Sequence, residues 1–416
     1  MSRVPAVRFE GFTDPWEQRK LGELMDVTSV RRVHQEDWTD EGVRFLRARD
    51  IVAFAKNEPI DDPLYISEEM YQEYSVQSGK VSTEDLLVTG VGTIGVPWLV
   101  TSDNPIYFKD GNIIWFKNAG EIDGEFFYHS FTAGTIQKFI QEAAGIGTVG
   151  TYTIETGKKT PIWLPTKQEQ RCVATFMTNL DSLITLHQRK YEKLCVVKKS
   201  LLDKMFPKPG ELYPEIRFEG FTDPWEQRKL GEVAEIVGGL TKNPTRNAMS
   251  LRLPYLRVAN VEMGSIDVAE MLTIGVTREE ASKLELRADD LLFVEGNGAK
   301  SQIGRVAIWK DQLEHCVHQN HLIRARCVDA YPDYVAQYFS SNQGRFEIEG
   351  KAFTSSGLYS LSIEKIKDLS LSLPLPREQV AVGSLLARLD SLITLHQRKL
   401  ELLKNLKAAC LDKMFV

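Results

Sequence analysis

The chain repeats itself at one fixed spacing of 209 residues. Three segments recur letter for letter: RFEGFTDPWEQRKLGE at 8–23 and 217–232, LDSLITLHQRK at 180–190 and 389–399, and LDKMF at 202–206 and 411–415. Repeats at a single spacing indicate copies of one structural unit. We therefore expect two units of the same plan, each with an opening box, a middle and a closing segment.

The two middles, residues 24–163 and 233–372, are equal in length but share little identity. The stretch DLLV that begins at Asp85 resembles DLLF at Asp290, a spacing of 205, whereas later positions such as Ile154 and Ile363 return to 209. A shortfall of four residues in one place is thus made up in another. Two domains of one fold that differ in detail explain this pattern.

The closing segments predict two long helices. Apolar side chains recur at heptad spacing in both copies, which is typical of a coiled-coil seam. At 1.5 Å per residue, each helix would be about 55 Å long. Two equal units in one chain favour a pseudo-twofold, antiparallel pairing. The expected seam residues are Phe176, Leu180, Leu183, His187 and Leu194 in the first copy, and Leu385, Leu389, Leu392, His396 and Leu403 in the second.

The two seam histidines, His187 and His396, are expected to lie near the middle of the rod and to face each other. Polar side chains at seam positions commonly set the register of a coiled coil. We favour that role over a metal site between the two rings.

Composition limits the class of protein. A length of 416 residues suggests two to three domains. No run reaches 18 apolar residues, which excludes a transmembrane helix, and residues 1–8 lack the apolar core of a secretion signal. Five scattered cysteines form no disulfide framework and favour a reducing cytoplasm. The net charge is −6 although the closing segments are basic, so any DNA contact must come from local patches of the middles.

Glycine-rich motifs do not predict a cofactor. Gly90–Gly95 (GVGTIG) has dinucleotide-binding spacing, but Val96 and Pro97 follow where a helix should begin, so a hairpin loop is expected. Its counterpart, Gly296–Ser301, lacks the spacing of a phosphate-binding loop.

A group of possible metal ligands also lacks a recognisable spacing. His315, Cys316, His318, His321 and Cys327 lie among strand-forming residues, and their order fits no zinc site. Neither a methyltransferase tetrapeptide nor a helicase-type P-loop occurs in the chain. Paired aspartates such as Asp289-Asp290 are interpreted as solvated. We expect no metal, no cofactor and no catalytic residue.

Polar and basic residues in the middles suit nucleic-acid binding. Arg and Asn side chains read base edges, and Lys holds phosphates. The candidate DNA contacts are Arg44, Arg47, Arg49, Thr93, Tyr152 and Lys158 in the first middle, and Arg257, Asn260, Asn297, Lys300, Gln302, Ser355 and Tyr359 in the second. The alternative is that they are ordinary surface residues.

The arrangement as a whole resembles a known family. An opening box ending PWEQRKLGE, a variable middle, LPxxxEQ at 164–170 and 373–379, and a helix that contains LDSLITLHQRK and ends near LDKMF all occur twice. Over essentially the whole chain this is similar to the specificity subunit of type I restriction–modification enzymes. The resemblance implies two mixed α/β target recognition domains, each reading half of a bipartite, asymmetric DNA site. It also implies an antiparallel coiled coil that sets the spacing and docks methyltransferase subunits.

The expected domains follow from these features. They are residues 1–165 and 217–374 for the target recognition domains, 166–206 and 375–416 for the helical spacers, and 207–216 for the linker. The expected partners are double-stranded DNA, two methyltransferase subunits and, in the full complex, motor and restriction subunits, but no membrane. The chain itself would be the non-catalytic member of a complex that methylates adenine or cleaves DNA.

Two alternatives remain open at this stage. The first is a stand-alone DNA-binding regulatory protein on the same scaffold, which gel shifts with and without a modification subunit would distinguish. The second is an enzyme whose chemistry lies in the middles, which methyl transfer by the purified chain would reveal. The DNA sequence itself depends on loop geometry and DNA deformability and is not predicted.

Overall fold

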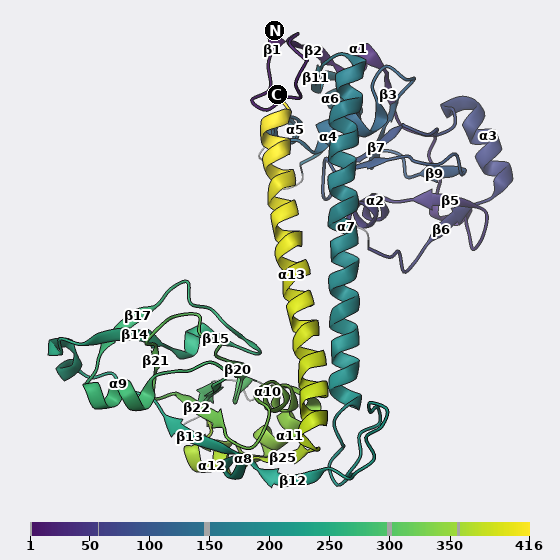
Figure 1. Ribbon diagram of the computed structural model, residues 1–416. Coiled ribbons are helices and arrows are strands. Elements are labelled where there is room, and N and C mark those ends of the chain that lie inside the picture. Colours follow the sequence, from purple (N-terminus) through teal and green to yellow (C-terminus); the bar gives the residue numbers. More distant parts are fainter. Residues whose placement is uncertain (1, 57, 145–149, 298–301, 356–357) are drawn as a thin grey trace. The chain divides into compact units, whose positions relative to one another are not determined.

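The computed structural model describes residues 2–56, 58–144, 150–297, 302–355 and 358–416. It divides into two compact units, residues 1–188 with 398–416 and residues 189–397. Each unit contains one α/β domain and parts of two long helices, α7 (Lys167–Lys204) and α13 (Pro376–Met414) (Figure 1). We call the residues before α7 the first domain and those between α7 and α13 the second domain.

The first domain is built on two sheets. One is antiparallel, with strand order β3-β10-β7-β8, and the other has the order β4-β6-β5-β9. The strands are β3 (Asp26–Thr28), β4 (Trp38–Thr39), β5 (Val43–Leu46), β6 (Leu64–Ile66), β7 (Leu86–Thr89), β8 (Pro97–Leu99), β9 (Ile106–Phe108) and β10 (Ile113–Lys117). The helices are α2 (Ala48–Lys56), α3 (Glu68–Ser78), α4 (Gly124–Thr132), α5 (Gly134–Ala143) and α6 (Ile154–Lys159).

The DLLV strand is apolar throughout because both of its faces are buried. Leu86 and Val88 of β7 pack into a core with Phe126 of α4, whereas Leu87 points to a second core shared with the other sheet. The side chains of a strand alternate between its faces, so a strand between two cores needs apolar residues at every position. The matching strand of the second domain, β18 (Leu291–Val294), divides in the same way between two cores.

The second domain repeats this plan. Its antiparallel sheet has the order β13-β22-β18-β20, and a smaller sheet has the order β17-β14-β21. The remaining strands are β13 (Ala234–Gly238), β14 (Arg252–Leu256), β15 (Val261–Glu262), β16 (Ser265–Ile266), β17 (Leu272–Gly275), β19 (Gly296–Asn297), β20 (Val306–Ile308), β21 (Val317–His318), β22 (Leu322–Cys327), β23 (Phe353–Ser355) and β24 (Leu358–Ser360). The helices are α9 (Arg278–Leu284), α10 (Pro332–Ser340), α11 (Asn342–Lys351) and α12 (Ile363–Lys367).

The four-residue offset between the middles has two structural sources. Helix α3 has 11 residues and its counterpart α9 has 7, so the first domain gains one helical turn. The segment between β18 and β20 is in turn four residues longer than the one between β7 and β8. These two changes of length cancel, which explains why the two middles are equally long.

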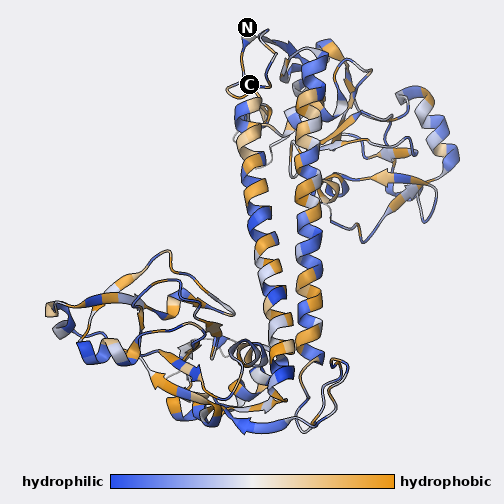
Figure 2. Cartoon of the chain, viewed as in Figure 1, coloured by the Kyte–Doolittle hydropathy of each residue, from blue (hydrophilic) through white to orange (hydrophobic). Residues whose placement is uncertain are grey.

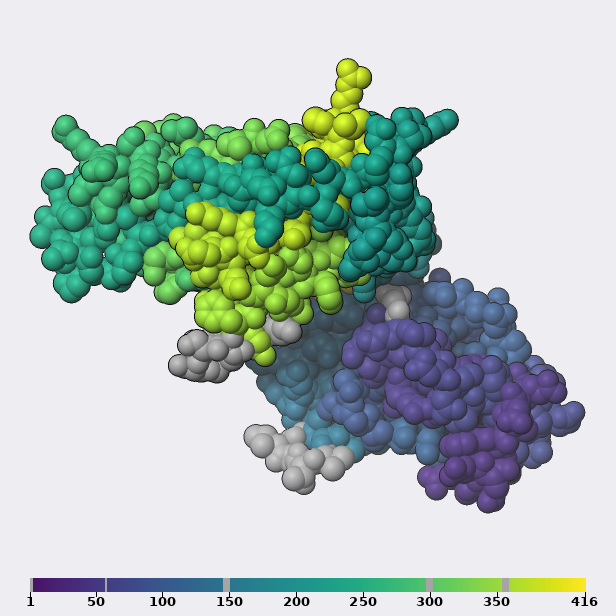
Figure 3. Space-filling model, turned by 90° about the horizontal axis from the view of Figure 1, so that it is seen from below, coloured from purple at the N-terminus to yellow at the C-terminus, as the bar shows by residue number. Residues whose placement is uncertain are grey.

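The opening boxes form matching joints with the segments that lead into the long helices. In the first unit β1 (Ser2–Arg3) and β11 (Pro161–Leu164) pair with β2 (Trp16–Lys20), and α1 (Leu21–Leu24) follows. In the second unit β12 (Glu226–Lys229) pairs with β25 (Ser370–Leu373), and α8 (Leu230–Val233) follows. Figure 3 shows the teal opening box of the second unit beside the yellow-green residues near the end of its middle.

A buried ion pair fastens each joint. The guanidinium of Arg8 donates to both carboxylate oxygens of Glu169, at 2.6 and 2.7 Å, and Arg217 does the same to Glu378 at 2.7 and 2.8 Å. Both glutamate side chains are fully buried. A bidentate pair of this kind is strong and fixes geometry. The first helical turn of each long helix is thereby tied to its opening box.

The glutamine that follows each buried glutamate connects the helix to its domain. Gln170 donates to the carbonyl of Pro165 and accepts from the backbone N–H of Asp123, at 3.1 and 3.0 Å. Gln379 makes the same two bonds with Pro374 and Tyr331, both at 2.9 Å. The glutamate and glutamine of LPxxxEQ are therefore structural residues of the joint.

The last turn of each long helix is buried in a core of the same unit. Phe206 packs against Trp225, Tyr334 and Tyr338 in the second unit. Phe415 packs against Trp16 and Phe126 in the first. The repeated LDKMF ends are thus plugs, and each unit combines the beginning of one long helix with the end of the other.

Within each unit the two helices run antiparallel. In the first unit the start of α7 shares a core with Met414 and Phe415, and further along α7 Asp181 pairs with Lys407 at 2.5 Å. In the second unit the matching pair joins Lys198 to Asp390. Lys198 of α7 and Lys407 of α13 are therefore each neutralised by an aspartate of the other helix.

The seam differs from the predicted one at every second position. Leu183 and Leu392, both predicted to be in the seam, are 43% exposed. The side chains turned inward at these positions lie one residue later in the heptad: Met177, Ile184, Met205, Leu386, Ile393, Leu400 and Met414. The other half of the seam keeps its predicted heptad position and contains Val173, Leu180, Leu194, Val382, Leu389, Leu403 and Cys410. Phe176 packs on Phe9 with ring centroids 5.8 Å apart, and Leu385 packs on the second-domain core.

The two seam histidines belong to different units, His187 to the first and His396 to the second. Both side chains are partly buried. The predicted approach of the two rings stays a prediction.

The joint pair can be tested by removing one charge. Because Glu169 is buried with Arg8, Glu169→Gln leaves a guanidinium without its counter-charge, and we expect a loss of about 3 kcal/mol in unfolding free energy. Glu23→Gln breaks the exposed Arg19–Glu23 pair and should have a much smaller effect. Urea unfolding followed by tryptophan fluorescence measures both. Equal midpoints for the two variants would contradict this role of Glu169.

Candidate nucleic-acid interface

In each domain a glycine-containing hairpin bonds to the segment that follows two consecutive helices. These helices are α4 and α5 in the first domain and α10 and α11 in the second. In the first domain the N–H of Gly90 donates to the carbonyl of Asn112, and the N–H of Tyr152 donates to the carbonyl of Gly90, both at 2.8 Å. In the second domain the backbone N–H of Glu295 donates to the carbonyl of His321 at 2.9 Å, and the N–H of Leu361 donates to the carbonyl of Glu295 at 2.7 Å. The predicted hairpin loop is confirmed by the pairing of β7 with β8.

In the second domain several predicted DNA contacts lie together. Strands β19, β24 and β23 form a three-stranded sheet whose backbone contains Asn297, Ser355 and Tyr359. Tyr359 is partly buried against the core, and Gln302, farther along the hairpin, is exposed. The side chains of Asn297 and Ser355, and Lys300 as a whole, lie outside the described residues. We take this hairpin and its added strands as the candidate reading surface of the second domain.

The first domain presents a smaller version of the same surface. Thr93 is exposed on the hairpin, between Gly92 and Gly95, whose φ angles of +71° and +77° require glycine-like backbone freedom. Tyr152, also predicted to contact DNA, is 2% exposed, and its hydroxyl bonds to Thr160. Burial raises the pKa of this phenol. Tyr152 is a core residue, so the prediction of DNA contact was wrong for it.

The predicted arginines beside the second sheet are largely occupied by the protein itself. Arg47 holds Asp50 through two bonds of 3.0 and 3.2 Å and reaches the backbone carbonyl of Asp62. Arg49 bonds to Asp62 at 2.8 Å, and Arg44 lies over the ring of Tyr65 at 5.5 Å. Arg47 and Arg49 thereby stabilise the loop that follows α2, whereas Arg44 packs on the neighbouring strand β6. Arg49, 61% exposed, is the most accessible of the three.

The matching residues of the second domain have the same structural role. Arg257 donates to the carbonyl of Glu270, and Asn260, 5% exposed, accepts from the N–H of Arg257 at 3.0 Å. The amide of Asn260 also donates to the carbonyl of Asp267. Asn260 closes a turn inside the domain, so the prediction of base contact was wrong for it.

Lys158, the remaining predicted contact in the first domain, lies on helix α6. Its ammonium pairs with Glu155 at 2.9 Å, and its side chain is 43% exposed. Its Cβ packs against the opening box, where a side chain at Gly22 would meet it at 2.8 Å. Lys158 therefore belongs to the joint side of the domain.

The histidines and cysteines of 315–327 point to different partners. The Nδ1 atoms of His315 and His321 bond to Glu285 and Glu295, at 2.7 and 2.8 Å. His318 is buried and bonds to the carbonyl of Leu322, and burial lowers its pKa to about 4. The expected strand context is confirmed by β21 and β22.

Asp290 is buried rather than solvated, which corrects the interpretation of the paired aspartates. Its two carboxylate oxygens each accept from Arg326 at 2.7 Å. The matching Asp85 is also buried, accepts from the indole N–H of Trp115 at 2.8 Å, and has a pKa raised by burial. Both aspartates immediately precede the strand that lies between the two cores of their domain, so they are structural.

Comparison with known proteins identifies the family that shares this architecture. The sequence model of the "Type I restriction modification DNA specificity domain" matches residues 13–195 and again residues 222–405. The chain belongs to the type I DNA specificity family. Both matches run from the opening box into the long helix, so each copy of the repeat corresponds to one family domain.

Individual relatives agree with this assignment. The specificity subunit of the type I restriction enzyme EcoKI from Escherichia coli is 29% identical over 189 residues, 44% of this chain and 40% of that subunit. The MjaIX specificity subunit of Methanocaldococcus jannaschii is 23% identical over 415 residues, 96% of this chain and 92% of its own length. The aligned part thus spans less than half of the EcoKI subunit but nearly all of the archaeal one.

A solved structure shows the same fold. The type I restriction–modification S subunit from M. genitalium superposes with a TM-score of 0.57 at 15% identity and covers 99% of both chains. In the described part of this specificity chain, every helix is too short or too polar to cross a membrane.

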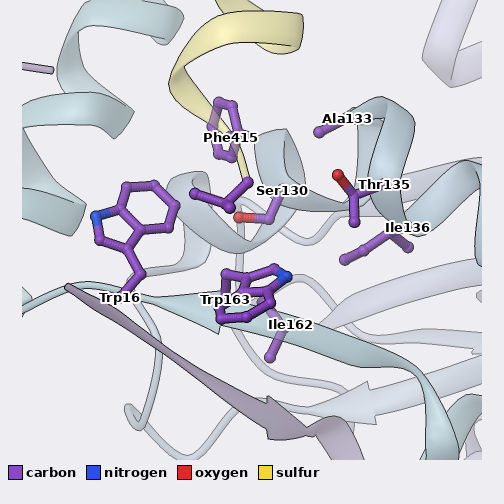
Figure 4. Close-up of a pocket in the computed structure, with 9 residues that line it drawn as sticks. Trp16, Ser130, Ala133, Thr135, Ile136, Ile162, Trp163 and Phe415 are labelled. Atoms are coloured by element: carbon purple, nitrogen blue, oxygen red, sulfur yellow. The ribbon is translucent and has the colours of Figure 1, made fainter. Parts of the chain in front are cut away.

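A small cavity in the first unit of the specificity chain lies at the plugged helix end rather than at the hairpin (Figure 4). It offers about 10 Å³ and is lined by residues that include Trp16, Ser130, Trp163 and Phe415. In the second unit, the larger Tyr338 and Gln343 occupy the places of Ser130 and Thr135 in the matching helices. The cavity is therefore a packing difference between the two joints.

Filling this position should strengthen the first joint. The amide of Gln343 donates to the carbonyls of Asp203 and Phe206, at 3.1 and 3.3 Å. We expect Thr135→Gln to make the matching bonds to the end of α13 and to add about 1 kcal/mol of stability. Thermal unfolding measures the gain. Thr135→Glu, which cannot donate, is the control, and an equal gain in both variants would contradict the bond.

Proposed function

We propose that the chain is the non-catalytic specificity subunit of a type I restriction–modification complex. Each domain would read one half of a bipartite, asymmetric DNA site through its hairpin surface. The observation that carries the proposal is the contrast between identical joints and unlike middles. Because the opening boxes, helix cores and plugs are repeated, the scaffold treats both domains alike, whereas the two hairpins differ in length and chemistry.

The reading surface of the first domain contains few charges among its described residues. In the first domain the exposed described residues of the hairpin surface are glycines and threonines such as Thr93. A neutral surface supplies little of the salt-dependent phosphate attraction that dominates DNA affinity. We therefore expect the isolated chain to bind DNA weakly and partner subunits to supply much of the clamp. Strong specific binding by the chain alone would favour a stand-alone regulator instead.

Both units also present an apolar stripe on their helices. In the first unit the exposed leucines are Leu183 and Leu186 of α7 and Leu402 and Leu406 of α13. In the second unit Leu392 and Leu395 of α13 repeat the α7 pair at the same exposures of 43% and 45%. Figure 2 shows hydrophobic residues along both long helices.

These exposed residues share two heptad positions next to the seam. In antiparallel helices, equal flanking positions of the two partners lie on the same side of the pair. The leucines of α7 and α13 in the first unit thus form one apolar face, and exposed apolar faces of this kind mark protein interfaces. Because the 11-residue stretch LDSLITLHQRK is identical in both units, we infer two docking sites for two copies of one partner, a methyltransferase subunit.

The docking sites can be counted by mutation. We expect Leu186→Ser or Leu395→Ser alone to release one modification subunit and the double variant to release both. Native mass spectrometry of the assembled complex measures the stoichiometry. Val76→Ser, at a residue of α3 that is 85% exposed and lies outside the two long helices, is the control. A double variant that retains both partners would contradict this docking surface.

Mapping of methylated adenines tests the function as a whole. DNA treated with the chain and its modification subunits should be methylated at one bipartite, asymmetric sequence. The purified chain alone should transfer no methyl group from labelled cofactor. Methyl transfer by the chain alone would establish the competing enzyme hypothesis.

The helices should set the gap between the half-sites. Inserting seven residues into both α7 and α13, after Gln188 and after Gln397, keeps the heptad register and adds about 10.5 Å to each helix. At about 3.4 Å per base pair, we expect a spacer longer by about three base pairs and unchanged half-sequences. Methylation mapping of the variant measures the spacer. An unchanged spacer in a folded variant would show that the helices do not set it.

A further inference from the structure

A second segment of the second domain leaves the large sheet beside the hairpin. Strands β13 and β18 both pair antiparallel with β22, so they run in the same direction. Their last residues, Gly238 and Val294, lie opposite Ile323 and Leu322, which are neighbours at the start of β22. The segments that follow β13 and β18 therefore leave the sheet at the same edge.

Backbone bonds anchor the segment after β13 next to the hairpin. The N–H of Asn320 donates to the carbonyl of Leu240 at 3.0 Å, and the carbonyl of the next residue, His321, accepts from the N–H of Glu295, which follows β18. Lys242 is two residues beyond Leu240, and two residues span at most about 7 Å. Lys242 therefore lies close to the reading surface of the second domain.

The first domain has a matching turn after β3. A short 3-10 turn follows the first strand of each large sheet, Gln35–Asp37 in the first domain and Pro244–Ala248 in the second. The residues that precede the two turns, His34 and Asn243, are 209 residues apart, which is the spacing of the repeat. The two turns are therefore equivalent parts of the two domains and can be compared position by position.

The two segments that contain these turns carry opposite charge. Residues 29–42, between β3 and β5, include four acidic and two basic residues, and both arginines pair with acidic residues elsewhere in the domain. Residues 239–251, between β13 and β14, include two basic residues and no acidic one. The exposed Lys242 of the second segment takes the place of Val33, which is 6% exposed. The second segment alone therefore suits a polyanion.

The other cation of the second segment, Arg246, is used inside the domain. Its guanidinium donates to both carboxylate oxygens of Glu280, at 2.7 and 3.0 Å, and to the carbonyls of Thr241 and Gly275. The bonds from Arg246 lower the pKa of Glu280 to about 2, so this pair is neutral overall at neutral pH. Lys242 makes no ion pair with any residue that the structure describes, and its charge is the net charge of the turn.

The backbone on both sides of Lys242 is held in place. The carbonyl of Thr241 accepts from Arg246 at 2.9 Å, and the side chain of Asn243 accepts from the backbone N–H of Arg246 at 3.2 Å. A group that is already fixed before it binds loses less conformational entropy on binding. The turn therefore positions Lys242 for a ligand in advance.

We propose that Lys242 binds a DNA phosphate beside the second half-site, a proposal that rests on the proposed function. A lysine ammonium is a point charge that suits a phosphate, and a phosphate contact carries no sequence information. The contact fixes the second reading surface against the duplex and strengthens binding to every sequence alike. The first domain has the buried Val33 at the matching place, and a buried valine makes no such contact.

The chain supplies a matched control for this lysine. Lys367 is exposed on α12 of the same domain but lies on the joint side, where a side chain at Gly231 would meet its Cβ at 3.0 Å. Lys242→Gln and Lys367→Gln remove the same charge at two different places. Lys242→Arg keeps the charge at the proposed contact. Because Lys242 is exposed, its variants should unfold at the temperature of the wild type, which thermal unfolding checks.

The experiment measures binding of the assembled complex to DNA between about 50 and 200 mM salt. The probes are a duplex that carries the bipartite site found by methylation mapping and a duplex of scrambled sequence. Each phosphate contact adds about 0.9 to the slope of log affinity against log salt concentration. We expect Lys242→Gln to weaken binding of both duplexes about five-fold and to reduce the slope by about 0.9. Lys242→Arg and Lys367→Gln should bind as the wild type does.

The outcomes separate the inference from the function beneath it. An unchanged slope in Lys242→Gln, or an equal loss of slope in Lys367→Gln, would overturn the phosphate contact and leave the proposed function standing. Weaker binding of the specific duplex alone would overturn it too, because a phosphate contact acts on both duplexes. Equal affinity of the wild-type complex for the specific and scrambled duplexes would overturn the proposed function, and the inference with it.

Discussion

The structure depends on how each long helix begins and ends. A bidentate arginine–glutamate pair, Arg8 with Glu169 or Arg217 with Glu378, ties the first turn to an opening box. The last turn ends in a Met-Phe plug that fills an aromatic core. Removing either partner of a buried ion pair leaves an uncompensated charge, so these joints tolerate little change. The residues that make these contacts are the same in both copies of the repeat.

The two middles can differ in sequence because the joints that hold them are the same in both units. Strands β7 and β18 lie between two cores in both domains and stay apolar at every position. The lengths of the two middles differ at one helical turn of α3 and at four residues of the β18–β20 segment, where an insertion does not disturb the cores. The hairpin is the place where a change alters the exposed surface without disturbing either core. It is therefore suited to determine which DNA sequence each domain reads.

The sequence was sufficient for the duplication, the long helices and the hairpin loop, since these depend on repetition, periodicity and turn residues. The mixed α/β class of the middles followed from the resemblance to the specificity family. It was not sufficient for the register of the seam. Leu183 and Ile184 are adjacent and both apolar, so a spacing of three or four fits equally well, and only packing selects Ile184. Burial also decided against Tyr152 and Asn260, whose polar groups are satisfied inside the fold. The His321–Glu295 pair joins positions 26 residues apart that only the tertiary structure brings together.

The central claim is that identical joints hold interchangeable readers, and one exchange tests it most directly. Replacing the first middle, residues 24–163, by a copy of the second, residues 233–372, leaves every joint and plug segment in place. Methylated adenines of DNA treated with this variant complex would then be mapped. The account predicts a symmetric site, with the second half-sequence present twice as an inverted repeat across an unchanged gap. Methylation of the original asymmetric site by the variant would contradict it.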